Sequence, residues 1–164
     1  MVNELHQFDE NSFFYLLDDN ERKLVKERMR EEHFPLGKHV FRENDSDERL
    51  YIVEKGAVSL IKSLGSDLHK TILIAPKGSI FGEFSFIDGG TRSATALASD
   101  DTILLGLDRK DFDLLNREFP EIGTKLYNNL LHTVTLRIRN TTEAHWRTIE
   151  NVIKNEKWIN PDVG

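Results

Sequence analysis

One carboxylate and one guanidinium, Glu83 and Arg92, stand in a stretch of the chain that is otherwise apolar, small or flexible. The guanidinium of Arg92 can donate two parallel hydrogen bonds to the exocyclic oxygens of a phosphate, which a lysine ammonium reproduces poorly. Glu83 can accept a hydrogen bond from a ribose hydroxyl. Gly82 lets the backbone come close to a sugar phosphate where a side chain would clash. These residue types predict a site for a ligand with one phosphate and one free ribose hydroxyl.

The residues around this pair add to the same chemistry. Residues 83–87 are expected to form one helical turn whose first N–H groups point at the phosphate. Ser85 and Ser93 are candidates for further hydrogen-bond donors. A buried Glu83 or Arg92 without a partner would cost roughly 3–5 kcal/mol, so each needs one. The alternative is that Arg92 is a strand-surface residue and that Glu83, at the start of a helix, pairs with it.

The run from Phe81 to Ala96 resembles the phosphate-binding cassette of cyclic nucleotide-binding domains. It reads Phe-Gly-Glu-Phe-Ser-Phe, then a loop, then Arg-Ser-Ala, and the spacing from Glu83 to Arg92 fits that cassette without a gap. Over about residues 14–157 the chain is similar to the ligand-binding half of regulators of the catabolite activator protein type. The ligand-binding residues that the resemblance implies are Gly82, Glu83, Phe84, Ser85, Arg92, Ser93, Ala94, Leu60, Ile72, Leu73, Thr141 and Thr142.

The resemblance implies a cyclic nucleotide as the ligand, with its phosphate on Arg92 and its 2′-hydroxyl on Glu83. Ser93 favours cyclic AMP, because a threonine at this position tends to accompany cyclic GMP in the family's kinase-type members. Thr141 and Thr142 would meet the amino group of the base, or else be ordinary polar positions of a helix. Leu60, Ile72 and Leu73, which precede the cassette, would line the base or the ribose, or else belong to the core of the roll.

Three residues depart from the usual cassette. Phe84 and Phe86 are bulkier than the common leucines, and Thr91 stands where proline is common. The phosphate chemistry is unaffected by these changes, but the shape of the pocket stays open. Cyclic GMP, a cyclic dinucleotide, and a degenerate domain that acts only as a protein-interaction scaffold are therefore the remaining alternatives.

The chain has 164 residues, of which 30% are charged, and a formal net charge of −6. This acidic balance argues against general nucleic-acid binding, and local donors such as Arg92 must attract an anionic ligand. Cysteine is absent, which removes disulfides and thiolate metal sites and is compatible with a reducing cytoplasm. No run is apolar enough to span a membrane, and the polar start does not resemble a signal peptide. We expect a cytoplasmic protein without membrane contact.

The sequence offers no pattern typical of an enzyme or a metal site. The six histidines are scattered, so a metal-dependent enzyme on a similar roll is not expected. The acidic tip Asp45, Asp47 and Glu48 lacks the spacing of a calcium loop and is interpreted as a solvated turn. Neither a Ser-His-Asp arrangement nor a Walker-type loop is present. We therefore expect a protein that is not an enzyme and holds no metal.

The hydrophobic pattern changes twice along the chain. Residues 11–32 are predicted to be helical, with Ser12 as a possible N-cap and with Pro35 and Gly37 ending the element. Residues 38–108 contain short β-branched runs between turns, which favours an antiparallel barrel or jelly roll. The resemblance implies the same α+β fold, a double-stranded β-helix or β-roll with the cassette helix inserted. The expected segments are 1–37, 38–108 and 109–164.

A helix is expected over residues 109–117, followed by a joint at Phe119-Pro120 and a long helix from Glu121 to Lys157. Its apolar positions recur at threes and fours over more length than a β-roll can cover. We expect a homodimer through this helix; the alternative is one long helix, or two broken ones, folded back on the roll. No winged helix-turn-helix like that of the resembling regulators follows the long helix, so we expect either a stand-alone sensor or one piece of a larger protein. We therefore expect no DNA binding by this chain and an unidentified protein partner.

Overall fold

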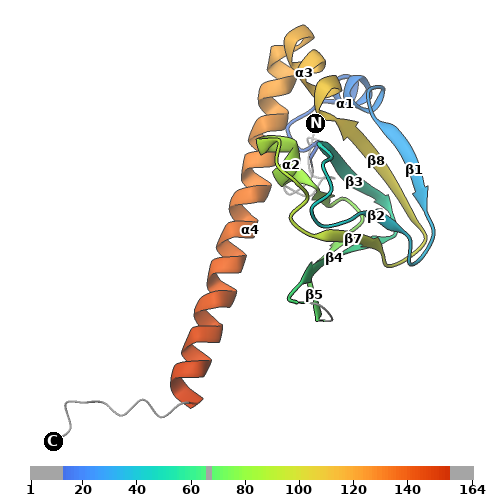
Figure 1. The fold of residues 1–164 in the computed structure, drawn as a ribbon. Helices are drawn as coiled ribbons and strands as arrows, with labels where there is room; N and C mark the ends of the chain where they lie inside the picture. The colour runs from blue at the N-terminus through green and yellow to red at the C-terminus, as the bar shows by residue number, and fades with distance from the viewer. Residues whose placement is uncertain (1–12, 66–67, 156–164) are drawn as a thin grey trace, which may run out of the picture. The chain divides into compact units, whose positions relative to one another are not determined.

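The computed structural model describes residues 13–65 and 68–155, and these fall into two units that meet at Leu130 and Leu131. The first unit holds both sheets and all helices up to the start of α4, and the second holds the rest of α4 (Figure 1). In chain order the elements are α1 (Asp19–Lys26), β1 (Arg30–Phe34), β2 (His39–Phe41), β3 (Arg49–Lys55), β4 (Ala57–Ser63), β5 (His69–Pro76), β6 (Ile80–Phe81), α2 (Glu83–Asp88), β7 (Thr95–Ala98), β8 (Thr102–Asp108), α3 (Arg109–Glu118) and α4 (Pro120–Asn155).

The strands form two four-stranded antiparallel sheets, in the orders β1-β8-β3-β6 and β2-β7-β4-β5. The predicted α+β fold with an antiparallel roll, an inserted cassette helix and a long C-terminal helix is confirmed. Consecutive strands of the chain belong to different sheets: β3 pairs with β8 in the first sheet, whereas β4 pairs with β7 in the second. This pairing brings the loop after β2 and the cassette after β6 to the same region, although they lie far apart in the sequence.

Strand β3 is buried on both faces, which explains its continuous apolar run. Leu50 and Ile52 belong to a core that includes residues of α1, α3 and α4, while Tyr51 and Val53 belong to a second core between the two sheets. Successive side chains of a strand point to opposite faces, so each core receives every second residue. The helices therefore cover one face of the first sheet, and the second sheet covers the other.

The predicted N-terminal helix over residues 11–32 is wrong at both ends, because residues 13–18 form a turn and coil rather than a helix. Helix α1 spans only Asp19–Lys26, and residues 30–34 form strand β1, which pairs with β8 from Arg30↔Gly106 to Phe34↔Thr102. The strand is polar and mostly exposed, so its apolar content does not reveal it, and its backbone hydrogen bonds come from a distant partner.

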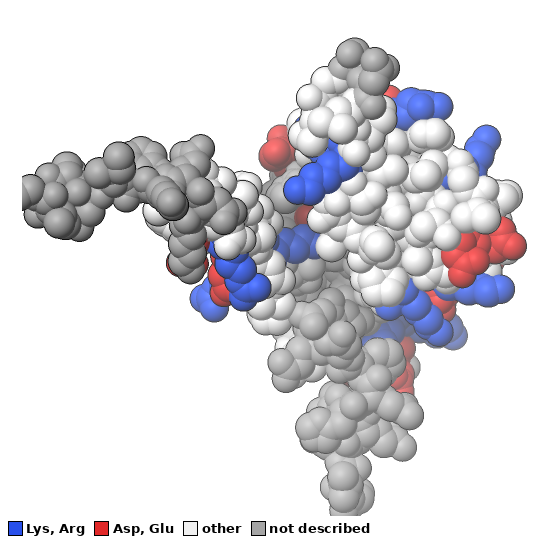
Figure 2. Space-filling view, turned by 90° about the horizontal axis from the view of Figure 1, so that it is seen from below, with Lys and Arg blue, Asp and Glu red and all other residues white. Residues whose placement is uncertain are grey.

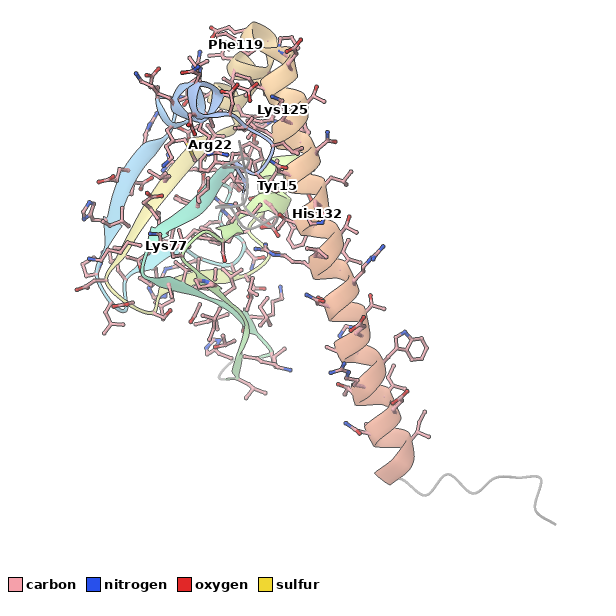
Figure 3. The ribbon with its side chains drawn as sticks, turned by 180° about the vertical axis from the view of Figure 1, so that it is seen from behind. Tyr15, Arg22, Lys77, Phe119, Lys125 and His132 are labelled. Atoms are coloured by element: carbon pink, nitrogen blue, oxygen red, sulfur yellow. The ribbon has the colours of Figure 1, made fainter. Side chains whose placement is uncertain are left out.

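The start of α1 is set by Asp18 rather than by Ser12, which lies outside the described residues. The Asp18 carboxylate accepts from the Glu21 backbone N–H at 2.9 Å, and the Glu21 carboxylate accepts from the Asp18 N–H at the same distance. This reciprocal capping box satisfies two otherwise free donors of the first turn. Glu21 also binds Lys125 of α4, labelled in Figure 3, with Nζ 2.6 and 2.8 Å from its two oxygens. The cap therefore also ties α1 to the first part of α4.

The predicted joint between the two C-terminal helices is confirmed. Helix α3 ends at Glu118, Phe119 leaves the helical region with φ −136° and ψ 74°, and Pro120 begins α4. The last two positions of the predicted long helix lie outside the described residues. Among the described helices, none combines the length and the hydropathy that a membrane span requires.

Candidate functional site

The cassette turn is bounded by two glycines in the left-handed region. Gly82 has φ +76° and precedes α2, and Gly89 has φ +70° and follows it. A Cβ on Gly82 would collide with Nη1 of Arg92 and lie 3.0 Å from the carbonyl oxygen of Arg49. Glycine is needed at this position both for the backbone angle and for the close approach of the arginine. The predicted helical turn over residues 83–87 is confirmed.

Arg92 is buried, with only 2% of its surface exposed. Nη1 donates to the carbonyl oxygen of Gly82 at 3.0 Å and to Oγ of Ser85 at 2.9 Å. Nη2 donates to Oδ2 of Asp47 at 2.5 Å and to the carbonyl oxygen of Arg49 at 2.7 Å. The alternative of a surface arginine is therefore wrong, because this guanidinium lies inside the protein and is oriented by four acceptors.

Two aromatic rings pack against the guanidinium of Arg92. Its Cζ lies 4.0 Å from the centre of the Phe41 ring and 5.8 Å from the centre of the Tyr51 ring. A cation over an aromatic face is stabilised by the ring quadrupole, and more strongly when it is shielded from water. Burial also raises the pKa of the Tyr51 hydroxyl above its ordinary value. The arginine is thus fixed in position by packing as well as by hydrogen bonds.

One donor of this arginine is unused. Among the buried side-chain nitrogen and oxygen atoms of the described residues, only Nε of Arg92 has no hydrogen-bond partner. Leaving a buried N–H unpaired costs about 1–3 kcal/mol, so such atoms are rare and call for an explanation. An anionic ligand oxygen would supply the acceptor that this N–H lacks, which fits the predicted phosphate role.

Glu83 is equally buried, with 2% of its surface exposed, at the first position of α2. Ser85 is buried on the same helix, and its hydroxyl accepts from Arg92. Gly82, Glu83, Ser85 and Arg92 therefore come together around one short turn. Phe84 has 44% of its surface exposed, whereas Phe86 is buried in the core.

The sequence analysis missed Asp47 as a partner of Arg92. The acidic tip was interpreted as a solvated turn, but Asp47 forms an ion pair with a buried guanidinium, and that interpretation is wrong for this residue. Asp45 does cap its own turn, because its Oδ2 accepts from the Arg42 N–H at 2.7 Å. A buried arginine requires a counterion, so the three acidic residues of the tip could have been recognised in the sequence as candidate partners of Arg92.

The remaining cassette residues differ in their exposure. Ala94 is buried in the core between the sheets. Ser93 is exposed, and its carbonyl oxygen accepts from Nζ of Lys62 at 2.8 Å. The same Nζ donates to Oε1 of Glu43 at 2.5 Å, and this hydrogen bond, with one from the Ser63 N–H, lowers the pKa of the Glu43 carboxyl. The start of β7 is thereby linked to β4 and to the loop after β2.

The three predicted apolar positions split into two groups. Leu60 of β4 pairs with Leu73 of β5. Leu60 belongs to the core between the sheets, and Leu73 packs against that core. Ile72 is 54% exposed and Ile74 is 61% exposed, because alternate residues of β5 point away from the core. The alternative that placed Ile72 in the core is therefore wrong. Thr141 and Thr142 are exposed on the part of α4 that forms the second unit.

A surface hollow of about 530 Å³ lies away from these residues, along α1. Its lining is formed by Phe14, Asp19, Arg22, Lys23, Lys26 and Glu27. No predicted site residue contributes to it. No group of three or more potential metal ligands occurs in the part of the chain that the structure describes. The cassette, where a buried cation and a buried carboxylate meet one glycine turn, is therefore the candidate site.

A profile of the cyclic nucleotide-binding domain matches residues 31–118, which is more than half of the chain and includes the whole cassette. The chain belongs to the cyclic nucleotide-binding domain family. This confirms the family that the cassette residues predicted. The match includes Asp47 and Arg92 and ends before Thr141 and Thr142.

The relatives of this chain include a receptor protein and a kinase regulatory subunit. The chain is 33% identical over 126 residues to the cyclic AMP receptor protein of Thermus thermophilus, covering 77% of this chain and 56% of that protein. It is 33% identical over 128 residues to the cAMP-dependent protein kinase regulatory subunit of Eremothecium gossypii, covering 77% of this chain and 26% of that protein. The chain thus spans little more than half of the first relative and about a quarter of the second.

Solved structures of the family have the same fold. The catabolite activator protein of Thermus thermophilus gives a TM-score of 0.74 at 30% identity, over 84% of this chain and 62% of that one. A cyclic nucleotide-binding domain from Methylobacillus flagellatus gives a TM-score of 0.77 at 28% identity, over 80% and 74% of the two chains.

Proposed function

We propose that this protein is a cyclic nucleotide sensor that binds cyclic AMP in the cassette and is not an enzyme. The observation that carries the proposal is the buried Arg92, whose Nε lacks an acceptor beside the glycine turn. Arg92 binds the cyclic phosphate, and Glu83 accepts a hydrogen bond from the ribose 2′-hydroxyl. The names of the cyclic AMP receptor protein and of the kinase regulatory subunit support cyclic AMP as the nucleotide.

Local groups must attract the ligand, because the formal net charge of the protein is −6. On the face shown in Figure 2, basic side chains lie beside acidic ones and do not form one continuous basic area. The discrimination between a cyclic nucleotide and other anions therefore depends on the buried donors of the cassette. A fixed guanidinium in a site shielded from water binds a phosphate more strongly than an exposed one, since screening is weaker there.

The long helix is the proposed output of the sensor. Its second-unit part carries large apolar side chains that are exposed in the single chain: Leu131, Ile138, Trp146, Ile149, Val152 and Ile153. A helix with apolar positions at threes and fours pairs readily with a second copy. We propose a homodimer through this surface and a change in the surface offered to a protein partner when the nucleotide binds. Such a change requires the ligand to favour one of two arrangements.

The test is titration calorimetry with cyclic AMP, cyclic GMP and 5′-AMP in parallel. The expected result is binding of cyclic AMP at micromolar concentration or tighter, with cyclic GMP weaker and 5′-AMP much weaker. A preference for cyclic GMP would change the nucleotide but keep the sensor. If none of the three binds, the proposal is wrong.

A second function is favoured by one observation, that the protein itself already fills four of the hydrogen bonds of Arg92. A domain whose own acceptors already hold both terminal nitrogens of the arginine can serve as a scaffold that binds only proteins. The same titration separates the two, because a scaffold gives no heat with any nucleotide.

A further inference from the structure

The four acceptors of Arg92 differ in how easily they can leave. Two are backbone carbonyl oxygens, of Gly82 before α2 and of Arg49 in β3, and these are fixed by the fold. The third is the hydroxyl of Ser85, which is buried. The fourth is the carboxylate of Asp47, whose side chain is 35% exposed in the loop between β2 and β3. Asp47 is both the only charged acceptor of the four and the one that can turn out toward water.

The geometry of the guanidinium decides which edge a phosphate can use. A bidentate contact needs two parallel N–H groups, and the group offers the Nε/Nη2 edge or the Nη1/Nη2 edge. Nη1 and Nη2 carry two N–H groups each, and all four are used, by Gly82 and Ser85 on Nη1 and by Asp47 and Arg49 on Nη2, so the Nη2 N–H beside Nε is occupied as well. On the first edge Nε has no partner. This edge becomes available for two bonds when Asp47 moves away from Nη2.

We propose that Asp47 is a built-in competitor for the phosphate, which takes its place on Nη2 when the ligand binds through the Nε/Nη2 edge. This inference rests on the proposed function. Exchanging one anion for another keeps the buried guanidinium paired throughout, so the arginine stays in place and the large cost of an unpaired buried charge does not arise. The competition lowers the affinity of the site, because part of the protein is always in the form that must first release Asp47.

The test compares two neutralising substitutions in the same loop, D47N and E48Q. Both remove one negative charge from neighbouring positions, but Glu48 is exposed and does not hydrogen-bond to Arg92. In titration calorimetry with cyclic AMP and cyclic GMP, D47N is expected to bind the preferred nucleotide about tenfold tighter than the natural protein. E48Q is expected to change the affinity by no more than about twofold, since it acts only through screened long-range charge.

A second readout distinguishes competition from a structural role. Thermal unfolding without nucleotide is expected to show that D47N is less stable than the natural protein, because a buried arginine loses its counterion. Lower stability together with tighter binding is the expected combination. A D47N protein that is less stable and binds more weakly, or binds as the natural protein does, overturns the inference.

The natural protein provides a measurement that does not depend on a variant folding. In ¹⁵N NMR, the Nε–H resonance of Arg92 is expected to shift and to become protected from exchange when the cyclic nucleotide is added, because this N–H gains an acceptor. An unchanged resonance at saturation overturns the inference but leaves the sensor. A natural protein that binds no cyclic nucleotide overturns both proposals.

Discussion

The cassette and the second-unit part of α4 depart from the usual distribution of residues in opposite ways. In the cassette, two charged residues are buried beside the apolar cores, with Arg92 and Glu83 each 2% exposed. On α4, apolar side chains such as Trp146 are exposed among polar ones, with 62% of the tryptophan surface accessible. Buried polar groups and exposed apolar surfaces are both common features of binding sites, and both proposals rest on them.

The two regions require partners of different kind. A buried donor without an acceptor calls for a small, charged ligand with matching geometry, because only a hydrogen bond compensates it. An exposed apolar helix face calls for another apolar surface, where contact area matters more than geometry. In the proposed sensor, ligand recognition depends on single atoms, and the proposed assembly depends on a whole face. The predictions below test this difference.

Arg92→Leu has the largest expected effect on the cassette. It removes the buried cation of the cassette and leaves the Asp47 carboxylate without its ion-pair partner. Calorimetry is expected to show binding of the cyclic nucleotide weakened by more than about tenfold. Arg42→Leu, an exposed arginine after β2, serves as the matched control and is expected to leave the affinity unchanged. Equal affinities of Arg92→Leu and the natural protein would remove Arg92 from the phosphate site.

Gly82→Ala tests whether the cassette depends on single atoms. The new Cβ collides with Arg92 in a backbone region that disfavours side chains, so unfolding in urea is expected to show a loss of about 3 kcal/mol or more. Gly78→Ala has a similar positive φ, of +87°, but its Cβ meets no atom within 4 Å. This control is expected to lose only about 1 kcal/mol. Equal losses would mean that the contact with Arg92 contributes nothing.

Trp146→Glu and Ile149→Glu test the exposed face of α4. Each places a charge where an apolar contact is proposed, so the dimer dissociation constant is expected to rise more than about tenfold for each. Thr148→Glu, exposed on the same stretch, is the control and is expected to have a smaller effect. Light scattering at micromolar concentration measures the mass. A monomer mass for the natural protein would exclude the dimer altogether.

The smallest expected effect concerns pH and the ion pairs outside the cassette. Burial acts to raise the pKa of Asp108, but the bond from Arg49 Nε at 2.8 Å and the charges of Arg49 and Arg30 lower it below its ordinary value. A carboxyl with a lowered folded-state pKa stabilises the protein above its unfolded pKa of 3.8, and this contribution is lost as the pH falls through the folded value.

Urea unfolding at a series of pH values measures this loss. Asp108→Asn is expected to be less stable than the natural protein at pH 7 and to lose less stability between about pH 5 and pH 2. Glu143→Gln, exposed on α4, is the control. Parallel pH profiles of the natural protein and Asp108→Asn would show that this pair does not contribute to acid unfolding.

Local patterns in the sequence were enough to predict the family, the cassette and the antiparallel roll. Gly82, Glu83, Ser85 and Arg92 lie within a few residues of one short helix, so their local order already specifies one turn. The apolar runs of β3, β4 and β8 and the proline at the start of α4 are equally local, and the structure has these elements where they were predicted. Local patterns suffice wherever the interacting residues are neighbours in the chain.

The tertiary structure alone decided what surrounds the arginine. Three groups that are more than 40 residues away in the sequence contact Arg92 because β2 pairs with β7 and β3 pairs with β6: the Asp47 carboxylate, the Phe41 ring and the Arg49 carbonyl oxygen. Strand β1 is likewise visible only through its pairing with β8, since its own residues are polar. Strand pairing between distant segments determines which groups surround Arg92. Whether its Nε finds an acceptor depends on those groups, so no local sequence pattern predicts that this atom is unpaired.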